Sequence, residues 1–262
     1  MEPIYTSIRK RARQIASRNP LPKFYQDYTT ATQRSRSIFR SDPLIRRVRI
    51  QITRQLENDF GHGLKHAVKV AFDIGILMIV EGNRSGYSEP YTQRRVVLAQ
   101  CAALLHDIER KQNEHARIGS DTANQILHDY PFAPNEIEDI RLAIRNHEAF
   151  TSTTPSKTDE GTLLSDCLYD ADKFRWGPDN FTDTVWRMVS FSKTPFDKFV
   201  RYYPKGMKSL EKIKNTFRTD TGKQYGPQFI DLGIAIGEDL YQVILNEFSD
   251  TKTSVGNKTK RK

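Results

Sequence analysis

Two adjacent side chains that can bind a metal stand at the end of an apolar segment. Residues Val96 to Leu105 are apolar on every side except at Gln100, which is typical of a helix surrounded by protein. His106 and Asp107 follow directly. Burying two such polar groups is costly unless something satisfies them, and a metal ion does so directly. The dipeptide therefore indicates a candidate pair of metal ligands.

Four of the other five histidines fall on the inward faces of expected helices. Each continues a row of mostly apolar residues at helical spacing: His66 with Val70, Ile74 and Leu77; His115 with Ile118, Thr122 and Ile126; His147 with Ile137, Ile140 and Ile144; and His62 one turn before His66. A single histidine of this kind is more often a hydrogen-bonded core residue than a ligand. Four of them beside a His-Asp pair favour a shared metal site.

A further carboxylate would complete such a site, and the segment Tyr169 to Phe174 supplies two. Asp172 continues an apolar row through Leu164 and Leu168, whereas Asp170 continues one through Leu163 and Cys167. The periodicity only mildly prefers Asp172 and leaves both residues open as ligands.

Five pieces of the chain together resemble a known family. They are His66-Ala-Val-Lys-Val70, Leu104-Leu-His-Asp-Ile-Glu109, His115 with Gly119, Asn146-His-Glu148 and Asp170-Ala-Asp-Lys173. In their order and separations they resemble the HD-domain (His-Asp) metal-dependent phosphohydrolases, over about residues 56–175. The resemblance implies an all-α helical bundle and hydrolysis of a phosphate ester.

The resemblance also implies a set of site residues. His66, His106, Asp107 and Asp172 would bind the metal, with Asp172 chosen because the family's last aspartate directly precedes a basic residue. The ion would be manganese, magnesium, cobalt, nickel, iron or zinc, which mixed imidazole and carboxylate ligands suit. Asp170 would support the site or bond a helix end, and His62 lies outside the family pattern.

Four further residues are candidates for catalytic roles. Glu109 could orient or deprotonate a water, or be an exposed acid paired with Arg110 or Lys111. Lys173 is expected to contact phosphate, because a cation there would stabilise the phosphoryl charge. His115 and His147 could hydrogen-bond the phosphate, protonate the leaving oxygen or bind a second metal, and we favour the first two roles.

The elements that must position these residues are helical throughout. Apolar residues recur at three and four, and no hairpin dipeptide stands between alternating runs, so we predict an all-α protein. Ser41-Asp42-Pro43 is a helix start signal for a helix to about Asp59. Further helices are expected at about 62–81, 91–107, 113–129, 134–148, 161–173, 179–191, 194–203, 207–217 and 227–248. Segments rich in turn formers predict surface loops at 82–86, 151–156 and 218–226.

The positive charge belongs to the ends of the chain. The net charge is +9; residues 1–58 carry 13 Lys and Arg against 4 Asp and Glu, and residues 251–262 carry 5 against none. We therefore predict a basic N-terminal extension at 1–43, a helical domain at 44–250 with C-terminal helices completing the core, and a disordered basic tail at 251–262. These ends are expected to make at most weak, salt-sensitive contact with nucleic acid.

The remaining composition indicates a cytoplasmic protein. The longest apolar stretch, Ile74 to Val80, is far shorter than the roughly 20 residues that cross a bilayer, so no membrane contact is expected. No apolar signal core precedes Arg9, and Cys101 and Cys167 lie in helix-like segments rather than at metal or bridge spacings.

The expected function is metal-dependent hydrolysis of a phosphorylated small molecule, such as a nucleotide. Alternatives are a two-metal nucleotide phosphodiesterase, a non-catalytic module that senses a metabolite or binds nucleic acid and, more remotely, a two-iron oxygenase. In that module the basic first 58 residues would bind nucleic acid or a partner. Separately, the aromatic and basic residues within 191–205 could stack a base and hold its phosphates, or pack on the core as an amphipathic helix.

Overall fold

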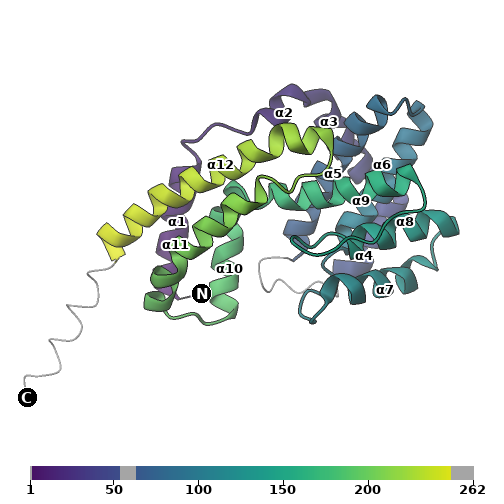
Figure 1. The fold of residues 1–262 in the computed structure, drawn as a ribbon. Coiled ribbons are helices and arrows are strands. Elements are labelled where there is room, and N and C mark those ends of the chain that lie inside the picture. The colour runs from purple at the N-terminus through teal and green to yellow at the C-terminus, as the bar shows by residue number, and fades with distance from the viewer. Residues whose placement is uncertain (1, 54–62, 249–262) are drawn as a thin grey trace, which may run out of the picture.

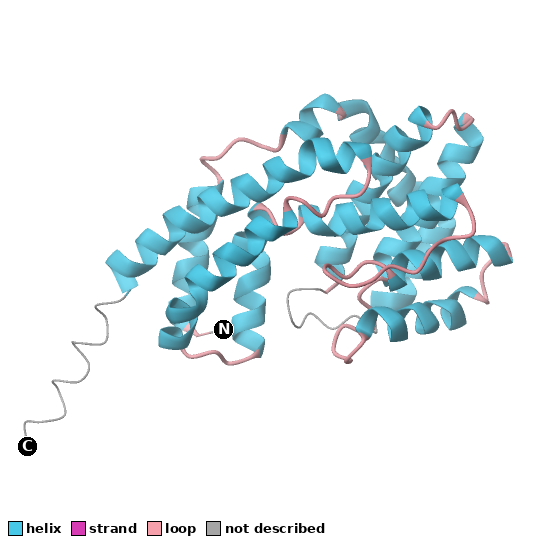
Figure 2. Ribbon diagram, viewed as in Figure 1, coloured by secondary structure: helices cyan, strands magenta, loops and turns pink. Residues whose placement is uncertain are grey.

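The structure is a computed structural model that describes residues 2–53 and 63–248. These residues form helices and no strand, so the prediction of an all-α fold is confirmed (Figure 2). The helices are α1 Pro3–Ala16, α2 Lys23–Asp27, α3 Thr29–Ser41, α4 Pro43–Thr53, α5 Leu64–Arg84, α6 Glu89–Leu105, α7 His115–Leu127, α8 Pro134–Arg145, α9 Asp159–Phe174, α10 Val185–Phe191, α11 Phe196–Ile213 and α12 Asp220–Val243, with π-helical turns η1 Asn180–Thr184 and η2 Ile244–Phe248.

The helices form two connected parts (Figure 1). In one, α5 packs along α6, α8 along α9, and α3 against α5; in the other, α10 and α11 lie beside α1. The long helix α12 contacts α1 and α11 in one part and α5 and α9 in the other, so it joins them. Helix α6 lies at the centre, and every residue from Val96 to Leu105 is buried, as its apolar sequence predicted.

The first helices belong to the same hydrophobic core as the rest. Tyr5, Ile8, Phe24 and Phe39 are almost fully buried, and the Tyr5 hydroxyl donates to the carbonyl oxygen of Thr194 at 2.6 Å. Residues 3–41 are therefore packed against the domain rather than projecting from it. The domain boundary at 43/44 stays a prediction, and the tail 251–262 lies outside the described residues.

The helix start at Pro43 is formed as expected. Oδ1 of Asp42 accepts hydrogen bonds from the backbone N–H groups of Leu44 at 2.9 Å and Ile45 at 3.1 Å. Asp42 thus satisfies donors that the first helical turn leaves without partners. The expected end of this helix near Asp59 lies outside the described residues.

The loop expected at 218–226 was largely wrong. Helix α12 begins at Asp220, and the side chain of the preceding Thr219 accepts a hydrogen bond from the backbone N–H of Gly222. Gly222 and Gly226 serve close packing rather than a turn, because a Cβ atom at Gly222 would lie 1.9 Å from Oδ2 of Asp170 and one at Gly226 would lie 2.3 Å from the Phe217 ring. Glycine content alone does not distinguish these two uses.

Two other boundaries differ from the sequence prediction. The helices expected at 194–203 and 207–217 form one helix, α11, which continues through Pro204. Helix α5 continues to Arg84, so only the last part of the expected loop at 82–86 is a turn. Phe199 and Tyr203 of α11 are buried against the core, which favours packing over base stacking for these two rings.

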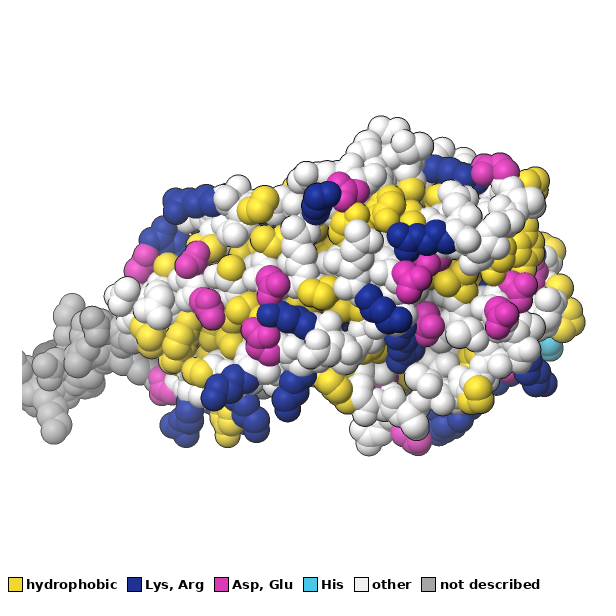
Figure 3. Space-filling model, turned by 45° about the horizontal axis from the view of Figure 1, so that its top comes forward, with side chains coloured by type: hydrophobic (Ala, Val, Ile, Leu, Met, Phe, Trp, Pro, Cys, Tyr) yellow, Lys and Arg dark blue, Asp and Glu magenta, His cyan; other side chains and the backbone are white. Residues whose placement is uncertain are grey.

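One face of the surface shows how the charged side chains are distributed. On the face in Figure 3, Lys and Arg are interspersed with Asp and Glu, and histidine shows only as a small area at the edge. Within the described residues, no helix combines the length and apolarity needed to cross a membrane.

Candidate metal centre

Three helix ends bring the predicted ligands together. His66 lies in the first turn of α5, His106 and Asp107 directly follow α6, and Asp172 lies in the last turn of α9. All four side chains are buried. Because α5 packs against both α6 and α9, residues far apart in the sequence meet at one place.

The ligand atoms of the four residues face one another at short range. Nε2 of His66 lies 3.1 Å from Oδ1 of Asp172 and 3.9 Å from Oδ2 of Asp107. Nε2 of His106 lies 3.3 Å from Oδ2 of Asp107 and 3.8 Å from Oδ1 of Asp172. Candidate ligand atoms of His66, His106 and Asp107 all lie within 4.8 Å of one another, so this group could hold a metal ion.

The hydrogen bonding of His106 prepares it to be a ligand. Its Nδ1 lies 2.7 Å from the carbonyl oxygen of Ala103, so we assign the proton to Nδ1, which leaves the Nε2 lone pair directed at the carboxylates. That Nε2 atom is buried and makes no hydrogen bond among the described residues. Such a backbone bond to the far nitrogen is typical of metal-bound histidines.

The charges at this centre also favour a cation. Burial alone would lower the pKa of His106, but the carboxylates of Asp107 and Asp172 raise it above its ordinary value. Burial likewise opposes ionisation of Asp172, yet Lys173 and the two histidines hold the pKa of this carboxyl well below its ordinary range. Carboxylate oxygens beside two imidazoles are a donor set that suits a divalent ion.

A second group of ligand-type side chains shares Asp107. Its other oxygen, Oδ1, lies 3.6 Å from Nε2 of His115 and 3.5 Å from Nε2 of His147, and these two nitrogens are 3.2 Å apart. Nδ1 of His147 lies 2.6 Å from the Ile144 carbonyl oxygen and Nδ1 of His115 lies 3.0 Å from Oε1 of Glu148. Both rings can therefore present Nε2 lone pairs toward Asp107, and the three residues could hold another ion.

The comparison with known families identifies this arrangement. Residues 63–177 match the family model of the HD domain. This stretch, less than half of the chain, is an HD domain. Searches among curated proteins and among solved structures gave no match to the chain. The matched range contains all six histidine and aspartate side chains of the two groups, and α3, α4 and α12 pack against its helices.

Arg110 is a member of the HD-domain site that the sequence analysis did not assign. Its Nη1 atom lies 2.7 Å from Nε2 of His115 and 3.8 Å from Oδ1 of Asp107. Burial and the positive charge of Arg110 lower the pKa of His115 to about 4, so this ring is neutral at neutral pH. Arg110 lies in the turn that follows Asp107, beyond the end of α6, so its closeness to Asp107 in the sequence was the available signal.

Lys173 is held inside the site. Its Nζ atom donates to Oδ2 of Asp172 at 2.6 Å and to the carbonyl oxygen of His147 at 2.9 Å, and it lies over the Tyr169 ring. The side chain is only 3% exposed. These contacts suit a residue that holds Asp172 in place, and the expected contact with phosphate stays a prediction.

The other carboxylates have identifiable contacts. Oε1 of Glu109 accepts a hydrogen bond from Thr122 at 3.0 Å, and Glu109 is half-buried. Asp170 turns away from the histidines and accepts hydrogen bonds from the backbone N–H groups of Arg218 and Thr219, each at 2.8 Å. Asp170 therefore joins α9 to the start of α12, which matches its expected helix-end role. His62 lies outside the described residues.

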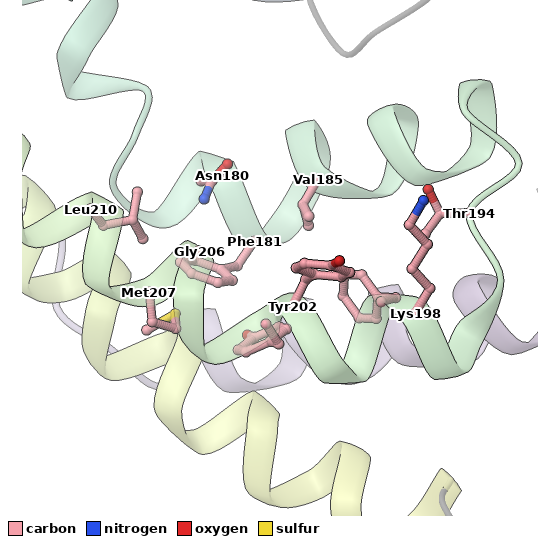
Figure 4. Close-up of a pocket in the computed structure, with 11 residues that line it drawn as sticks. Asn180, Phe181, Val185, Thr194, Lys198, Tyr202, Gly206, Met207 and Leu210 are labelled. Carbon is pink, nitrogen blue, oxygen red and sulfur yellow. The ribbon is translucent and has the colours of Figure 1, made fainter. Parts of the chain in front are cut away.

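A separate cavity of about 350 Å³ lies between α11 and the η1–α10 segment (Figure 4). Its wall is largely apolar and includes Phe181, Tyr202 and Met207, with Lys198 and Thr194 at one end. Its lining among the described residues contains no histidine or carboxylate, so it offers no metal ligands of the kind found in the HD-domain site.

Proposed function

We propose that this HD-domain protein is a metal-dependent phosphohydrolase that acts on a nucleotide or another phosphorylated small molecule. The observation that carries the proposal is the approach of His66, His106, Asp107 and Asp172 from three helices to one buried place. These four residues would hold one divalent ion, for which manganese, magnesium, cobalt, nickel, iron and zinc are the candidates.

A bound divalent ion would lower the pKa of a water molecule and offset negative charge on the phosphoryl group. The residues around it have complementary tasks. Glu109 would orient or deprotonate the attacking water, supported by its bond from Thr122. His115 and His147 would hydrogen-bond the phosphate or protonate the leaving oxygen through their adjacent Nε2 atoms. Either role requires a proton on Nε2 in the substrate complex, in place of the lone pair that a second ion would use.

A two-metal phosphodiesterase is the second candidate, and the position of Asp107 favours it. One carboxylate oxygen faces His66 and His106, and the other faces His115 and His147. A carboxylate between two histidine pairs is suited to bridging two ions. This geometry strengthens the second-metal role of His115 and His147 relative to the sequence analysis, although the Arg110 guanidinium stands beside the same atoms.

The experiment measures hydrolysis of a panel of phosphomonoesters, cyclic nucleotides and nucleotides, with each divalent metal added in turn. Free phosphate is the product followed for monoesters and nucleotides, and the phosphomonoester product is followed for cyclic nucleotides. The proposal predicts turnover only with metal, and none in Asp172→Ala. Turnover that persists in excess chelator would contradict it. Activity confined to cyclic or linear diesters, with two ions bound per chain, would favour the phosphodiesterase.

The proposed setting is cytoplasmic, which the two buried free cysteines, Cys101 and Cys167, support. Contact of the basic ends with nucleic acid remains a prediction of at most weak binding. A salt-resistant, sequence-selective complex with DNA or RNA would instead favour the non-catalytic binding module.

A further inference from the structure

Three cations line a pocket that also contains the metal-ligand candidate His66. Lys65 and Lys69 lie on the first turns of α5, and Arg187 lies on α10. We call these three residues the cationic wall. Arg187 comes from outside the range that matches the HD-domain model, so its position is a feature of this chain's own C-terminal helices.

Two acidic residues in the same pocket are already engaged by other cations. Asp179 accepts from Arg175 and from Lys69, each at 2.6 Å. Asp183 lies 2.5 Å from Arg9 and 3.0 Å from Arg13. Although burial opposes its ionisation, the surrounding cations lower the pKa of Asp183 below its ordinary value. These carboxylates are therefore ionised and shared among more positive charges than they can neutralise.

Arg187 is the cation of the wall that neither Asp179 nor Asp183 pairs with. It is half-buried, and no ion pair or hydrogen bond joins its guanidinium to an acidic group among the described residues. Lys65 is only loosely paired, with 3.4 Å between its Nζ atom and Oδ2 of Asp183. A half-buried guanidinium without a carboxylate is suited to an anion from outside, and its planar fork matches the oxygens of a phosphate.

The surface beside the wall combines these cations with an apolar floor. A depression next to the pocket is lined by Leu64 and Val68 together with Lys65, Lys69 and Arg187. The apolar floor, Lys65 and Lys69 come from the first turns of α5, which also carry His66, whereas Arg187 comes from α10. A molecule that reaches from the metal centre across this surface would meet an apolar patch and positive charge.

We propose that Arg187, together with Lys65, binds a second anionic group of the substrate. The protein would then prefer molecules that carry an anionic group in addition to the phosphate that is hydrolysed. This inference rests on the proposed function, because the bound molecule is a substrate only if the protein is a phosphohydrolase. The binding of a second anionic group can nevertheless be measured without turnover. Such a contact would select among substrates by a second anionic group, which the metal ligands do not contact.

The test compares two non-hydrolysable probes, propane-1,3-diphosphonate and propylphosphonate, which differ by one anionic group. Calorimetric titration of the full chain with divalent metal gives the ratio of their affinities. We expect the diphosphonate to bind about tenfold more tightly, as a charged hydrogen-bonded contact would provide. Arg187→Gln should remove most of this ratio, and Arg187→Lys should keep part of it. Arg201→Gln, an exposed arginine of α11, is the matched control and should retain the ratio.

The outcomes separate this inference from the proposed function. An equal affinity of the wild-type protein for both probes would overturn it, as would a ratio that survives in a folded Arg187→Gln variant. A ratio that depends on Arg187 in a protein without phosphatase activity would support the anion site and remove the proposed function. Metal-dependent turnover, with a ratio of affinities that does not depend on Arg187, would support the proposed function and overturn the anion site.

Discussion

Nε2 of His66 lies 3.1 Å from Oδ1 of Asp172, although three helices separate α5 from α9 along the chain. Helix α5 contacts both α6 and α9, and this packing sets the first turn of one helix against the last turn of another. The site is therefore a product of the bundle's core rather than of a loop. Substitutions in this core should therefore change the free energy of unfolding, and substitutions of the ligands should change the metal content.

Asp170 and Asp172 should differ although they are neighbours on α9. Asp170→Ala leaves the N–H groups of Arg218 and Thr219 and the Thr219 hydroxyl without their acceptor. Buried donors without acceptors cost about 1–3 kcal/mol each, so we expect a loss of about 2 kcal/mol or more in the free energy of unfolding. Denaturant unfolding measures it. Metal content should stay unchanged in Asp170→Ala and fall in Asp172→Ala; the opposite pattern would contradict the ligand assignment.

Lys173 should stabilise the metal-free protein. Lys173→Met removes the buried cation that lies 2.6 Å from Oδ2 of Asp172. Breaking a buried ion pair costs about 3–5 kcal/mol, and added divalent metal should recover part of that loss by supplying a positive charge. Unfolding with and without chelator tests this. Lys205→Met, at an exposed position of α11, is the control, and equal stability of Lys173→Met and wild type in chelator would contradict the holding role.

The ion pairs of Asp183 with Arg9, Arg13 and Lys65 should make the stability of the protein depend on pH in the acid range. The folded pKa of Asp183 lies below its ordinary value of 3.8, so its contribution is present above about pH 4 and is lost as the pH falls through the folded pKa. Asp183→Asn should reduce stability at pH 7 by about 1 kcal/mol, a small value because Arg13 and Lys65 are largely exposed. The difference between variant and wild type should shrink below about pH 4. Thermal unfolding across pH 2–7 measures it, and a constant difference would argue against the charge effect.

Much of the site could be predicted because its signals are local. The apolar sequence around Val96 to Leu105 identifies a buried helix, and the His-Asp pair at its end is conspicuous for that reason. Asp172 is different, because the periodicity on α9 only mildly preferred it to Asp170, and the family resemblance chose between them. In the structure, Asp170 bonds the start of α12, a partner that the sequence places far away.

The remaining features depend on tertiary contacts without a local pattern. Gly222 resembles a turn residue in the sequence, yet its lack of a side chain makes room for Asp170. Arg187 is one cation among many, and only the approach of α10 to the first turns of α5 places it in a pocket with His66. Neither relationship has a helical period, so periodicity cannot reveal it.

The content of divalent metal in the purified, metal-reconstituted protein tests the central claim most directly. Plasma mass spectrometry should find stoichiometric metal in the wild type and in His128→Ala, which changes an exposed histidine. His106→Ala and Asp107→Ala should lose it. If folded His106→Ala and Asp107→Ala retained as much metal as the wild type, the proposed centre would be contradicted.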